Sequence, residues 1–459
     1  MTAAQSTNPL AAFQWTPQPC AEALITGLVA EFLERNAFAG ELKRKLYVEA
    51  GVRFSDLLDS IHVPSSQQAK DELAAAGYVR RPVPGTEERY VQEKGIFPEI
   101  VLDDRAVTSA YLKVESVADF LITWQNPAAI EGPPLGAIRR AQVESANSTE
   151  LWVIERHGHR GFDIPQLMPN EAVAILAHAE AFRRRRRGFE NDADGFAQVS
   201  RLIDAAIADL GVDRTCDLFF AAEREYWQRR NRAAQVQKNR QDRLGLGWAN
   251  HDHHTYRSSR EQFAKMIAVF EKLGFHCRER FYAGAQSGWG AQVLEQPGAG
   301  IIIFADVDLS PDELFEDFAH EGLAPRDKLG TVGLWCALHG EAFLEAGMHH
   351  LECQFDFDAL KHQLESGEGV RVMKPFTNFP YLRQAFTEGE IWSVRPERIE
   401  KLLHAGRITD EQARQFREKG ALGSHLENLE RNEGFKGFNQ TGVSEIIART
   451  DPRAQFAQH

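Results

Sequence analysis

The sequence contains no apolar run long enough to cross a membrane. A transmembrane helix needs about 18 consecutive apolar residues, and no stretch of the 459 residues approaches that length. The opening stretch, MTAAQSTNPLAAFQW, lacks the basic segment and the continuous apolar core of a secretory signal. We therefore expect a soluble protein that is neither anchored in a membrane nor secreted.

Cysteine is scarce, and its spacing does not suggest pairing. The cysteines are odd in number, lie far apart and form no Cys-x-x-Cys pair. This pattern favours a reducing cytoplasm and argues against a disulfide scaffold or a structural zinc site. The five residues are Cys20, Cys216, Cys277, Cys336 and Cys353.

An excess of positive charge is also missing, since 53 Lys and Arg stand against 66 Asp and Glu, for a net charge of −13. A protein this acidic repels nucleic acid unless it carries a local basic patch. The candidate patch is the run of arginines at 183–187, which follows an expected helix over 171–182. We interpret it as a solvated helix end, where cations suit the negative end of the dipole, and we expect no nucleic-acid partner.

Two widespread catalytic motifs do not occur. No Gly-x-Ser-x-Gly elbow is present, so serine-hydrolase chemistry has no support. Neither a Gly-x-x-x-x-Gly-Lys-Ser/Thr loop nor a Gly-x-Gly-x-x-Gly after a strand appears, so a phosphate-cradling loop is not expected either.

Changes in composition and hydrophobic pattern along the chain predict several regions, and a length of 459 residues also predicts more than one domain. We expect a disordered tail at 1–18 and a helical connector at 166–245. Between them, 19–165 is either a small α/β domain or a degenerate module of the kind described next. Residues 246–459 form the expected catalytic domain.

Residues 248–308 have the pattern of a strand, a helix and three further strands. Ser258 with Glu261 predicts a capping box at the helix start, and Gly274 predicts its end. Such a βαβββ module needs a second copy, which we expect to begin at 348–372 with the strand MHHLECQFDF, the helix DALKHQLES and the strand VRVMKP. The predicted fold class is α+β: paired βαβββ modules form an open half-barrel catalytic domain, preceded by a mixed, helix-rich N-terminal region.

Three short segments carry the residues that can bind a metal. They are Asn250–Thr255 and Gly347–Glu352, on the opening strands of the two modules, and the later run His425–Arg431. Alternation along a strand predicts that His251 and His253 share one face and that His254 lies on the other. Two histidines and one carboxylate on neighbouring strands can bind Fe(II), and this donor set also suits Mn(II) or Zn(II).

The region from about 250 to 449 resembles the C-terminal catalytic domain of 4-hydroxyphenylpyruvate dioxygenase and hydroxymandelate synthase, in the vicinal-oxygen-chelate superfamily. Asp252-His253 is similar to that family's first ligand pair, and Ala346-Gly347-Met348-His349-His350-Leu351 to its Ala-Gly-Val-Gln-His-Ile. The run His-Leu-Glu-Asn-Leu-Glu-Arg is similar to its Phe-Leu-Glu-Ile-Ile-Gln-Arg. The resemblance implies His253, His350 and Glu427 as metal ligands.

The same resemblance implies further roles near the ligands. Phe435, in Gly-Phe-Lys-Gly-Phe-Asn, is similar to the phenylalanine that stacks on the substrate, with structural packing as the alternative. His349 replaces the glutamine that helps to hold the keto acid, and residues 443–450 correspond to a closing helix that acts as a lid. The implied activity is a non-haem Fe(II)-dependent dioxygenase that acts with O2 on a 2-oxo acid or a related oxygen-chelating small molecule. Homo-oligomers are common among such relatives.

Three alternatives remain open at this stage. The 2-oxoadipate dioxygenase/decarboxylase group has similar segments that imply the ligands His157, His253 and Glu390. A redox-silent isomerase, epimerase or lyase of the same superfamily needs a metal such as Zn(II) or Mn(II) but no O2. A non-enzymatic binding or resistance module, with the N-terminal helices as a winged-helix-like adaptor, is the last.

Overall fold

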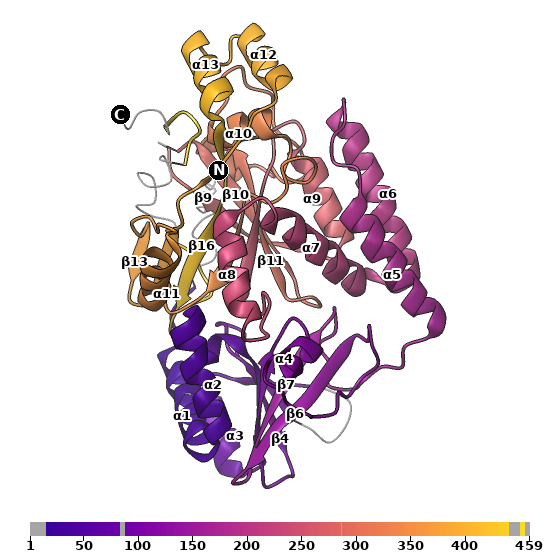
Figure 1. Ribbon diagram of the computed structural model, residues 1–459, viewed down its shortest axis with the longest axis vertical. Helices are drawn as coiled ribbons and strands as arrows, with labels where there is room; N and C mark the ends of the chain where they lie inside the picture. The colour runs from indigo at the N-terminus through magenta and orange to yellow at the C-terminus, as the bar shows by residue number, and fades with distance from the viewer. Residues whose placement is uncertain (1–14, 83–87, 286, 440–449, 455–459) are drawn as a thin grey trace, which may run out of the picture.

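The structure is a computed structural model that describes residues 15–82, 88–285, 287–439 and 450–454. Two mixed β-sheets lie one above the other, with the N-terminal sheet at the bottom of Figure 1 and the second sheet above it. A group of helices between the two sheets in sequence covers the second sheet on one side. The fold is therefore α+β with a helix-rich N-terminal half, as the sequence predicts.

The N-terminal sheet has seven strands in the order β2-β3-β4-β1-β5-β7-β6. Its helices are α1 (Pro19–Arg35), α2 (Ala37–Lys45), α3 (Gln67–Ala75) and α4 (Val117–Thr123), with a π-helical turn, η1 (Leu46–Ala50), and a 3-10 turn, η2 (Phe54–Leu57). Its strands are β1 (Leu58–Pro64), β2 (Val79–Arg81), β3 (Glu88–Val91), β4 (Glu99–Asp103), β5 (Thr108–Lys113), β6 (Ile138–Ala146) and β7 (Thr149–Arg156).

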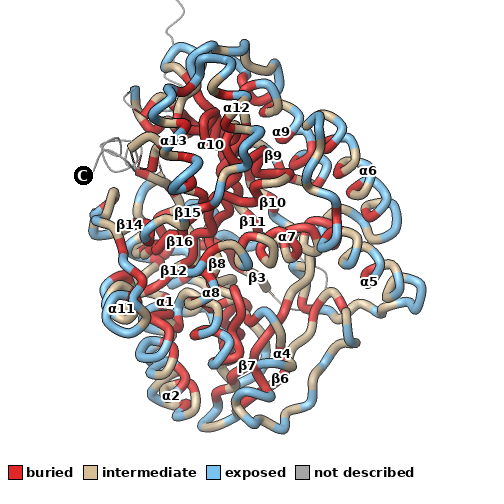
Figure 2. Tube along the Cα trace, turned by 45° about the horizontal axis from the view of Figure 1, so that its top comes forward, coloured by how far each residue is buried: buried red, intermediate tan, exposed pale blue. Residues whose placement is uncertain are grey.

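Four helices follow: α5 (Pro169–Arg184), α6 (Asp192–Leu210), α7 (Val212–Gln228) and α8 (Arg232–Asp242). The α7 helix packs a row of aromatic side chains toward the second sheet, and the rings of Phe219 and Phe220 lie within 5.5 Å of Phe343 and Phe275 respectively. This connector is therefore part of the core of the second half. Figure 2 shows its outer helices, α5 and α6, with largely exposed outward faces.

The second sheet has nine strands, in the order β13-β14-β16-β12-β8-β11-β10-β9, with β15 paired to β16. The first module is β8 (His251–Arg257), α9 (Phe263–Lys272), β9 (His276–Tyr282), β10 (Trp289–Gln296) and β11 (Ile301–Asp308). The second is β12 (His350–Gln354), α11 (Phe357–Gln363), β13 (Thr377–Phe379), β14 (Leu382–Phe386), β15 (Glu390–Trp392) and β16 (Ala421–Arg431). The remaining helices and turns are η3 (Asp312–Phe315), α10 (Thr331–His339), η4 (Leu364–Glu368), α12 (Pro396–His404) and α13 (Asp410–Lys419).

The two sheets share one topology. In the second, β8 pairs in parallel with β11 and antiparallel with β12, which pairs in parallel with β16. In the first, β1 pairs in parallel with β4 and antiparallel with β5, which pairs in parallel with β7. The N-terminal sheet thus repeats the paired-module arrangement with two strands fewer in its second module, which favours the degenerate-module alternative over an unrelated α/β domain.

The two halves meet at the π-helical turn η1 and the residue after it. The side chain of Gln237, on α8, donates to the carbonyl of Ala50, and the amide of Asp356 donates to that of Gly51. Gly51 has φ +67°, and a β-carbon there would lie 3.0 Å from the backbone of Leu360. Only glycine fits this turn without displacing α11, since other residues are strained at positive φ.

The expected capping box is wrong. Helix α9 begins at Phe263, four residues beyond the predicted start, and its N-cap Gln262 makes no side-chain capping bond. Ser258 is fully buried and donates instead to the carboxylate of Glu341, at 2.8 Å. The Ser258 hydroxyl therefore bonds to a residue distant in sequence and does not form the helix cap that the local sequence predicted.

The arginine run is only partly a solvated helix end. Arg184 has an 80% exposed side chain, but those of Arg185 and Arg187 are 1% and 8% exposed. Both bind the buried carboxylate of Glu223, on α7, and Arg185 also donates to the carbonyl of Phe343. The run thus joins the connector to the second sheet, which the expectation of a solvated cluster missed.

Two further predictions concern the strand VRVMKP and the closing helix. The segment VRVMKP forms a single bridge, between Val372 and Thr387, and the next strand begins only at Thr377. The expected closing helix at 443–450 falls, except for Thr450, outside the described residues. Among the described helices, none is long and apolar enough to span a bilayer.

Candidate metal centre

The three central strands of the second sheet align polar side chains in one row. In the register, Glu352 of β12 is the partner of His253 on β8 and of Glu427 on β16. Register partners on neighbouring strands project from the same face with about 5 Å between their β-carbons. His350, two residues before Glu352, projects from that face too. The register alone thus brings two imidazoles and two carboxylates together.

The functional atoms of this group converge in the interior. The Nε2 atom of His253 lies 3.0 Å from Oε1 of Glu352, and Nε2 of His350 contacts the same oxygen. The Nε2 atom of His350 is 3.7 Å from Oε2 of Glu427. Ligands bound at about 2.1 Å to one ion stand about 3 to 3.5 Å apart. The His253–Glu352 separation fits a shared cation, and ligand atoms of His253, Glu352 and Glu427 all lie within 4.8 Å of one another. Imidazole with carboxylate suits Fe(II), Mn(II) or Zn(II).

Asp252 fixes the orientation of His253. The carboxylate of Asp252 is 2.8 Å from Nδ1 of His253 and takes two bonds from Arg431, at 3.0 and 3.1 Å. Burial alone would raise the pKa of Asp252, but the Arg431 guanidinium and the bond to His253 hold it well below its usual range. An ionised Asp252 can only accept, so Nδ1 of His253 carries the proton and its Nε2 presents a lone pair to the site.

The two glutamates of the row have no Lys or Arg partner among the described residues. Their side chains are 0% and 3% exposed, and burial raises the pKa of both, to about 8 for Glu427. The neighbouring Glu427 charge raises the pKa of Glu352 further. Thr255 donates to Glu352 and Gln384 to Glu427, but within the described part of the chain neither carboxylate pairs with Lys or Arg. Such a pair calls for protons or for a cation.

The row opens into a narrow cavity of about 50 Å³. Asp306 lies on its wall, and burial raises the pKa of Asp306 to about 7 despite the opposing charge of Arg257. Drug-sized ligands occupy roughly 300 Å³ or more, so the cavity as it stands admits a cation and a few small atoms. Its aromatic lining consists of Phe281, Trp289, Phe304, Phe376, Phe386 and Phe438.

The three implied ligands, His253, His350 and Glu427, all lie in this cavity wall. His251 does not, because the pairing shifts between β8 and β12 at this point. Its ring packs 5.4 Å from that of His254, and its Nδ1 atom bonds to the carbonyl of Trp248. The prediction that His251 shares a face with His253 is therefore wrong.

The rival ligand set does not converge. His157, which follows β7, pairs with Asp217 on α7 at 3.0 Å and lines a different cavity. Glu390, on β15, accepts from the backbone amide of Arg232 at 3.0 Å. Neither residue borders the cavity that contains His253.

The aromatic ring beside the histidine is Phe438 rather than Phe435. Phe435 packs with Leu382 and Leu429 in a separate apolar cluster and lies outside the cavity lining. The ring of Phe438 is 5.2 Å from that of His253 and 4.4 Å from that of Phe304. Phe435 thus occupies a packing position, which was the alternative to a role in stacking on the substrate.

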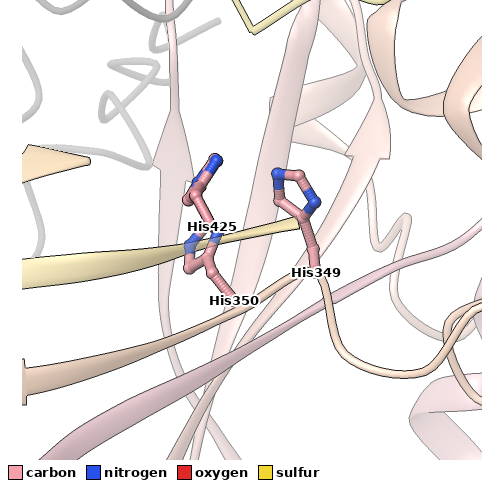
Figure 3. A group of neighbouring side chains, drawn as sticks. All are labelled: His349, His350 and His425. Atoms are coloured by element: carbon pink, nitrogen blue, oxygen red, sulfur yellow. The ribbon is translucent and has the colours of Figure 1, made fainter. Parts of the chain in front are cut away.

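A second group of imidazoles includes His350, which belongs to the row, and its register partner His425 on β16. His349, His350 and His425 each have a ring nitrogen within 4.8 Å of those of the others (Figure 3). The Nδ1 atom of His349 bonds to the carbonyl of Gly423, and its ring packs on Trp335. His349 therefore lies away from the cavity wall, unlike the glutamine that it replaces in the resemblance.

Glu352 and Gln384 are the site residues that sequence reasoning missed. Glu352 could have been found from alternation, since it follows His350 by two residues on a predicted strand. Gln384 had no such signal, because β14 was not predicted and its pairing with β16 decides which residues reach Glu427.

The N-terminal sheet offers an internal comparison. The corresponding strands align His62, Ser109 and Glu150 in a row. There Arg105 pairs with Glu150 at 2.9 Å. The face is filled by stacked aromatic side chains, with Tyr111 and Trp152 at 5.5 Å. In the N-terminal row, the carboxylate is thus paired with an arginine and aromatic side chains fill the face. In the second sheet, the carboxylates have no arginine partner in the described part of the chain and the row borders a cavity.

No family model and no curated protein matches the sequence. Solved structures do match. A mutant of 4-hydroxymandelate synthase from Streptomyces coelicolor is 15% identical over 75% of this chain and 98% of its own, with a TM-score of 0.29. A putative glyoxalase superfamily protein from Ralstonia eutropha is 12% identical over 58% and 97%, with a TM-score of 0.33. Methylmalonyl-CoA epimerase from Mycobacterium tuberculosis is 16% identical over 40% and 88%, with a TM-score of 0.23.

These structural neighbours are vicinal-oxygen-chelate proteins. Their identities to this chain are at most 16% and their TM-scores at most 0.33, so these similarities carry no further conclusion about this chain.

Proposed function

We propose that this chain is a metal-dependent enzyme that binds a divalent cation through His253, His350 and Glu427 and acts on a small molecule with adjacent oxygen atoms. The observation that carries the proposal is a buried group in which ligand atoms of His253, Glu352 and Glu427 lie within 4.8 Å of one another, with His350 3.7 Å from Glu427 and no Lys or Arg paired with either carboxylate among the described residues. The fixed tautomer of His253 supports it, because a histidine locked by a carboxylate is the usual arrangement of a metal ligand.

The first candidate chemistry is dioxygenation of a 2-oxo acid, with Fe(II) as the metal. Two histidines and one carboxylate form the ligand set of non-haem Fe(II) oxygenases, and the sequence resemblance points the same way. When bound, the cation supplies a Lewis acid and a redox centre. The chain itself orients His253 through Asp252, holds Glu427 through Gln384, and keeps water out with its aromatic walls.

The second candidate is redox-silent chemistry, an isomerase, epimerase or lyase that uses Zn(II) or Mn(II). The presence of Glu352 favours it, because a second carboxylate takes up space and coordination capacity that O2 needs. Both candidates require a small-molecule substrate, and only the first requires O2 as well.

The test is oxygen consumption by metal-loaded protein offered a panel of 2-oxo acids, with product analysis of the same mixtures kept anaerobic. Oxygen uptake on one substrate, lost in His253→Ala, supports the dioxygenase. Turnover that persists without oxygen supports the redox-silent candidate. His157→Ala is the matched control, since it removes a histidine outside the cavity and should leave activity unchanged. Loss of activity in the control instead would return the rival ligand set.

The remaining expectations stay predictions. We expect no nucleic-acid partner, since the net charge is −13 and two arginines of the basic run are buried against Glu223. We also expect a reducing, cytoplasmic location, and all five cysteines are free. A homo-oligomer remains a prediction from the resemblance.

A further inference from the structure

We propose that Glu352 is a fourth metal ligand, so that the chain supplies two imidazoles and two carboxylates to one divalent cation. The proposal rests on the proposed function and adds a residue that lies outside the segment, 346–351, on which the sequence resemblance rests. Glu352 lies in the middle of the row, between His253 on β8 and Glu427 on β16.

The contacts of Glu352 are those of a ligand rather than of a structural carboxylate. Its Oε1 atom lies 3.0 Å from Nε2 of His253 and touches Nε2 of His350. Because Nδ1–H of His253 donates to the ionised carboxylate of Asp252, the Nε2 atom faces Glu352 with a lone pair. A lone pair and a carboxylate oxygen at hydrogen-bond distance repel each other unless a cation or a proton lies between them.

The other atoms of the group lead to the same conclusion. The Nδ1 atom of His350 is buried and has no hydrogen-bond partner among the described residues. The carboxyl groups of Glu352 and Glu427 lie within hydrogen-bonding reach of each other, and two such groups in contact need a proton or a cation between them. The guanidinium of Arg431, on the same strand as Glu427, is paired with Asp252. In the N-terminal sheet, the one carboxylate of the corresponding row is bound by Arg105. The row of the second sheet has two carboxylates and, within the residues that the structure describes, no arginine paired with them. A divalent cation there has the neutralising role that Arg105 has in the N-terminal sheet.

The number of ligands determines what else can bind. A six-coordinate cation with four protein ligands has two positions left, which the paired oxygens of one chelating substrate fill. With three protein ligands, one more position stays open for O2. Coordination by Glu352 therefore shifts the choice between the two proposed chemistries toward the redox-silent one.

The experiment is titration of Co(II) into metal-stripped protein, followed by calorimetry and by the visible absorption of the bound ion. We expect Glu352→Gln to bind Co(II) at least tenfold more weakly than the unchanged protein and to alter the absorption spectrum. Glu341→Gln is the matched control. It removes another buried carboxylate, which bonds to Ser258 outside the row, and should leave the affinity and the spectrum unchanged.

The outcomes separate this proposal from the proposed function. If the unchanged protein binds Co(II) and E352Q binds it within twofold, with the same spectrum, Glu352 is not a ligand while the metal enzyme stands. If the unchanged protein binds no Co(II), both proposals are overturned. If circular dichroism shows that E352Q does not fold, Glu352→Asp is measured in its place. Aspartate keeps the carboxylate but is one methylene shorter, so the carboxylate lies farther from the other ligands. An E352D spectrum and affinity equal to those of the unchanged protein would overturn the proposal.

Discussion

Asp252 illustrates how one side chain outside the expected ligand set controls the site. It accepts from His253, from Arg431 and, at 2.9 Å, from Gln354. Its charge is therefore secured by a buried guanidinium on β16, and its position is secured by β12. A single carboxylate thus links the three strands that carry the candidate ligands.

Asp252→Asn should weaken metal binding 10- to 100-fold, because the amide no longer fixes the tautomer of His253. The matched control is Asp59→Asn, which breaks a comparable buried pair with Arg156 in the N-terminal sheet. Both variants should lose stability, but only D252N should lose metal affinity by calorimetry. Equal affinity in the two variants would show that Asp252 acts on the fold alone.

Glu341 predicts a pH dependence of stability. Burial raises the pKa of Glu341 to about 7 in the folded protein, against 4.5 for the unperturbed group. A raised folded-state pKa stabilises the fold fully below pH 4.5, and this contribution is lost as the pH rises through 7. Relative to the unchanged protein, Glu341→Gln should therefore gain roughly 1–3 kcal/mol between pH 5 and pH 8.

Urea denaturation at several pH values measures this gain. Glu316→Gln, at an exposed position on the same module, is the control and should show no relative change with pH. A pH-independent difference between E341Q and the unchanged protein would contradict the assignment.

At the scale of elements, the sequence predicted what period and spacing determine. The order β8-α9-β9-β10-β11 was predictable, since Phe263, Met266 and Phe270 recur on one helical face. The start of a helix and the face on which a strand residue lies were not predictable where tertiary contacts decide them, as Ser258 and His251 show. The sequence left open whether residues 19–165 are a degenerate module or an unrelated α/β domain, because the likeness of the two sheets lies in strand pairing rather than in motifs.

The candidate site was predicted to a similar extent. Resemblance supplied His253, His350 and Glu427, and the structure gathers them, although their role as ligands remains a proposal. It missed the register that inserts Glu352 among them, and it selected Phe435 where the fold presents Phe438. Neighbours across strands come from pairing, and one strand's sequence does not specify its partner's register.

The end of α5 predicts a contrast within one run of arginines. Arg185→Ala should cost about 3–5 kcal/mol of unfolding free energy, because it leaves buried Glu223 with one cation fewer. Arg184→Ala, one residue earlier and 80% exposed, should cost no more than about 1 kcal/mol. Chemical denaturation compares the two, and equal losses would mean that the connector is not held by the Glu223 pair.

At the scale of the whole molecule, one sheet carries the candidate metal row and its counterpart carries a row without that character. The N-terminal row is plugged by Tyr111 and Trp152 and neutralised by Arg105. The second sheet leaves its row open to a cavity. We interpret the first half as a packing partner that holds the second through the η1 turn.

Binding of a cation should stabilise the folded chain, since the unfolded chain has no such site. Saturation at 100 times the dissociation constant should add about 2.7 kcal/mol, and a chelator should reverse it. Thermal melts with and without added metal measure this. A melting temperature unaffected by Fe(II), Mn(II), Zn(II) or Co(II) would contradict it.

The most direct measurement is the metal content of protein purified without added metal, for the unchanged chain and for His253→Ala, His350→Ala, Glu427→Ala and His157→Ala. The account predicts about one divalent ion per chain, retained in the His157 variant and lost in the other three. No ion in the unchanged chain, even after loading, or retention of the ion in all three site variants, would show that the buried row is structural and that this is not a metal centre.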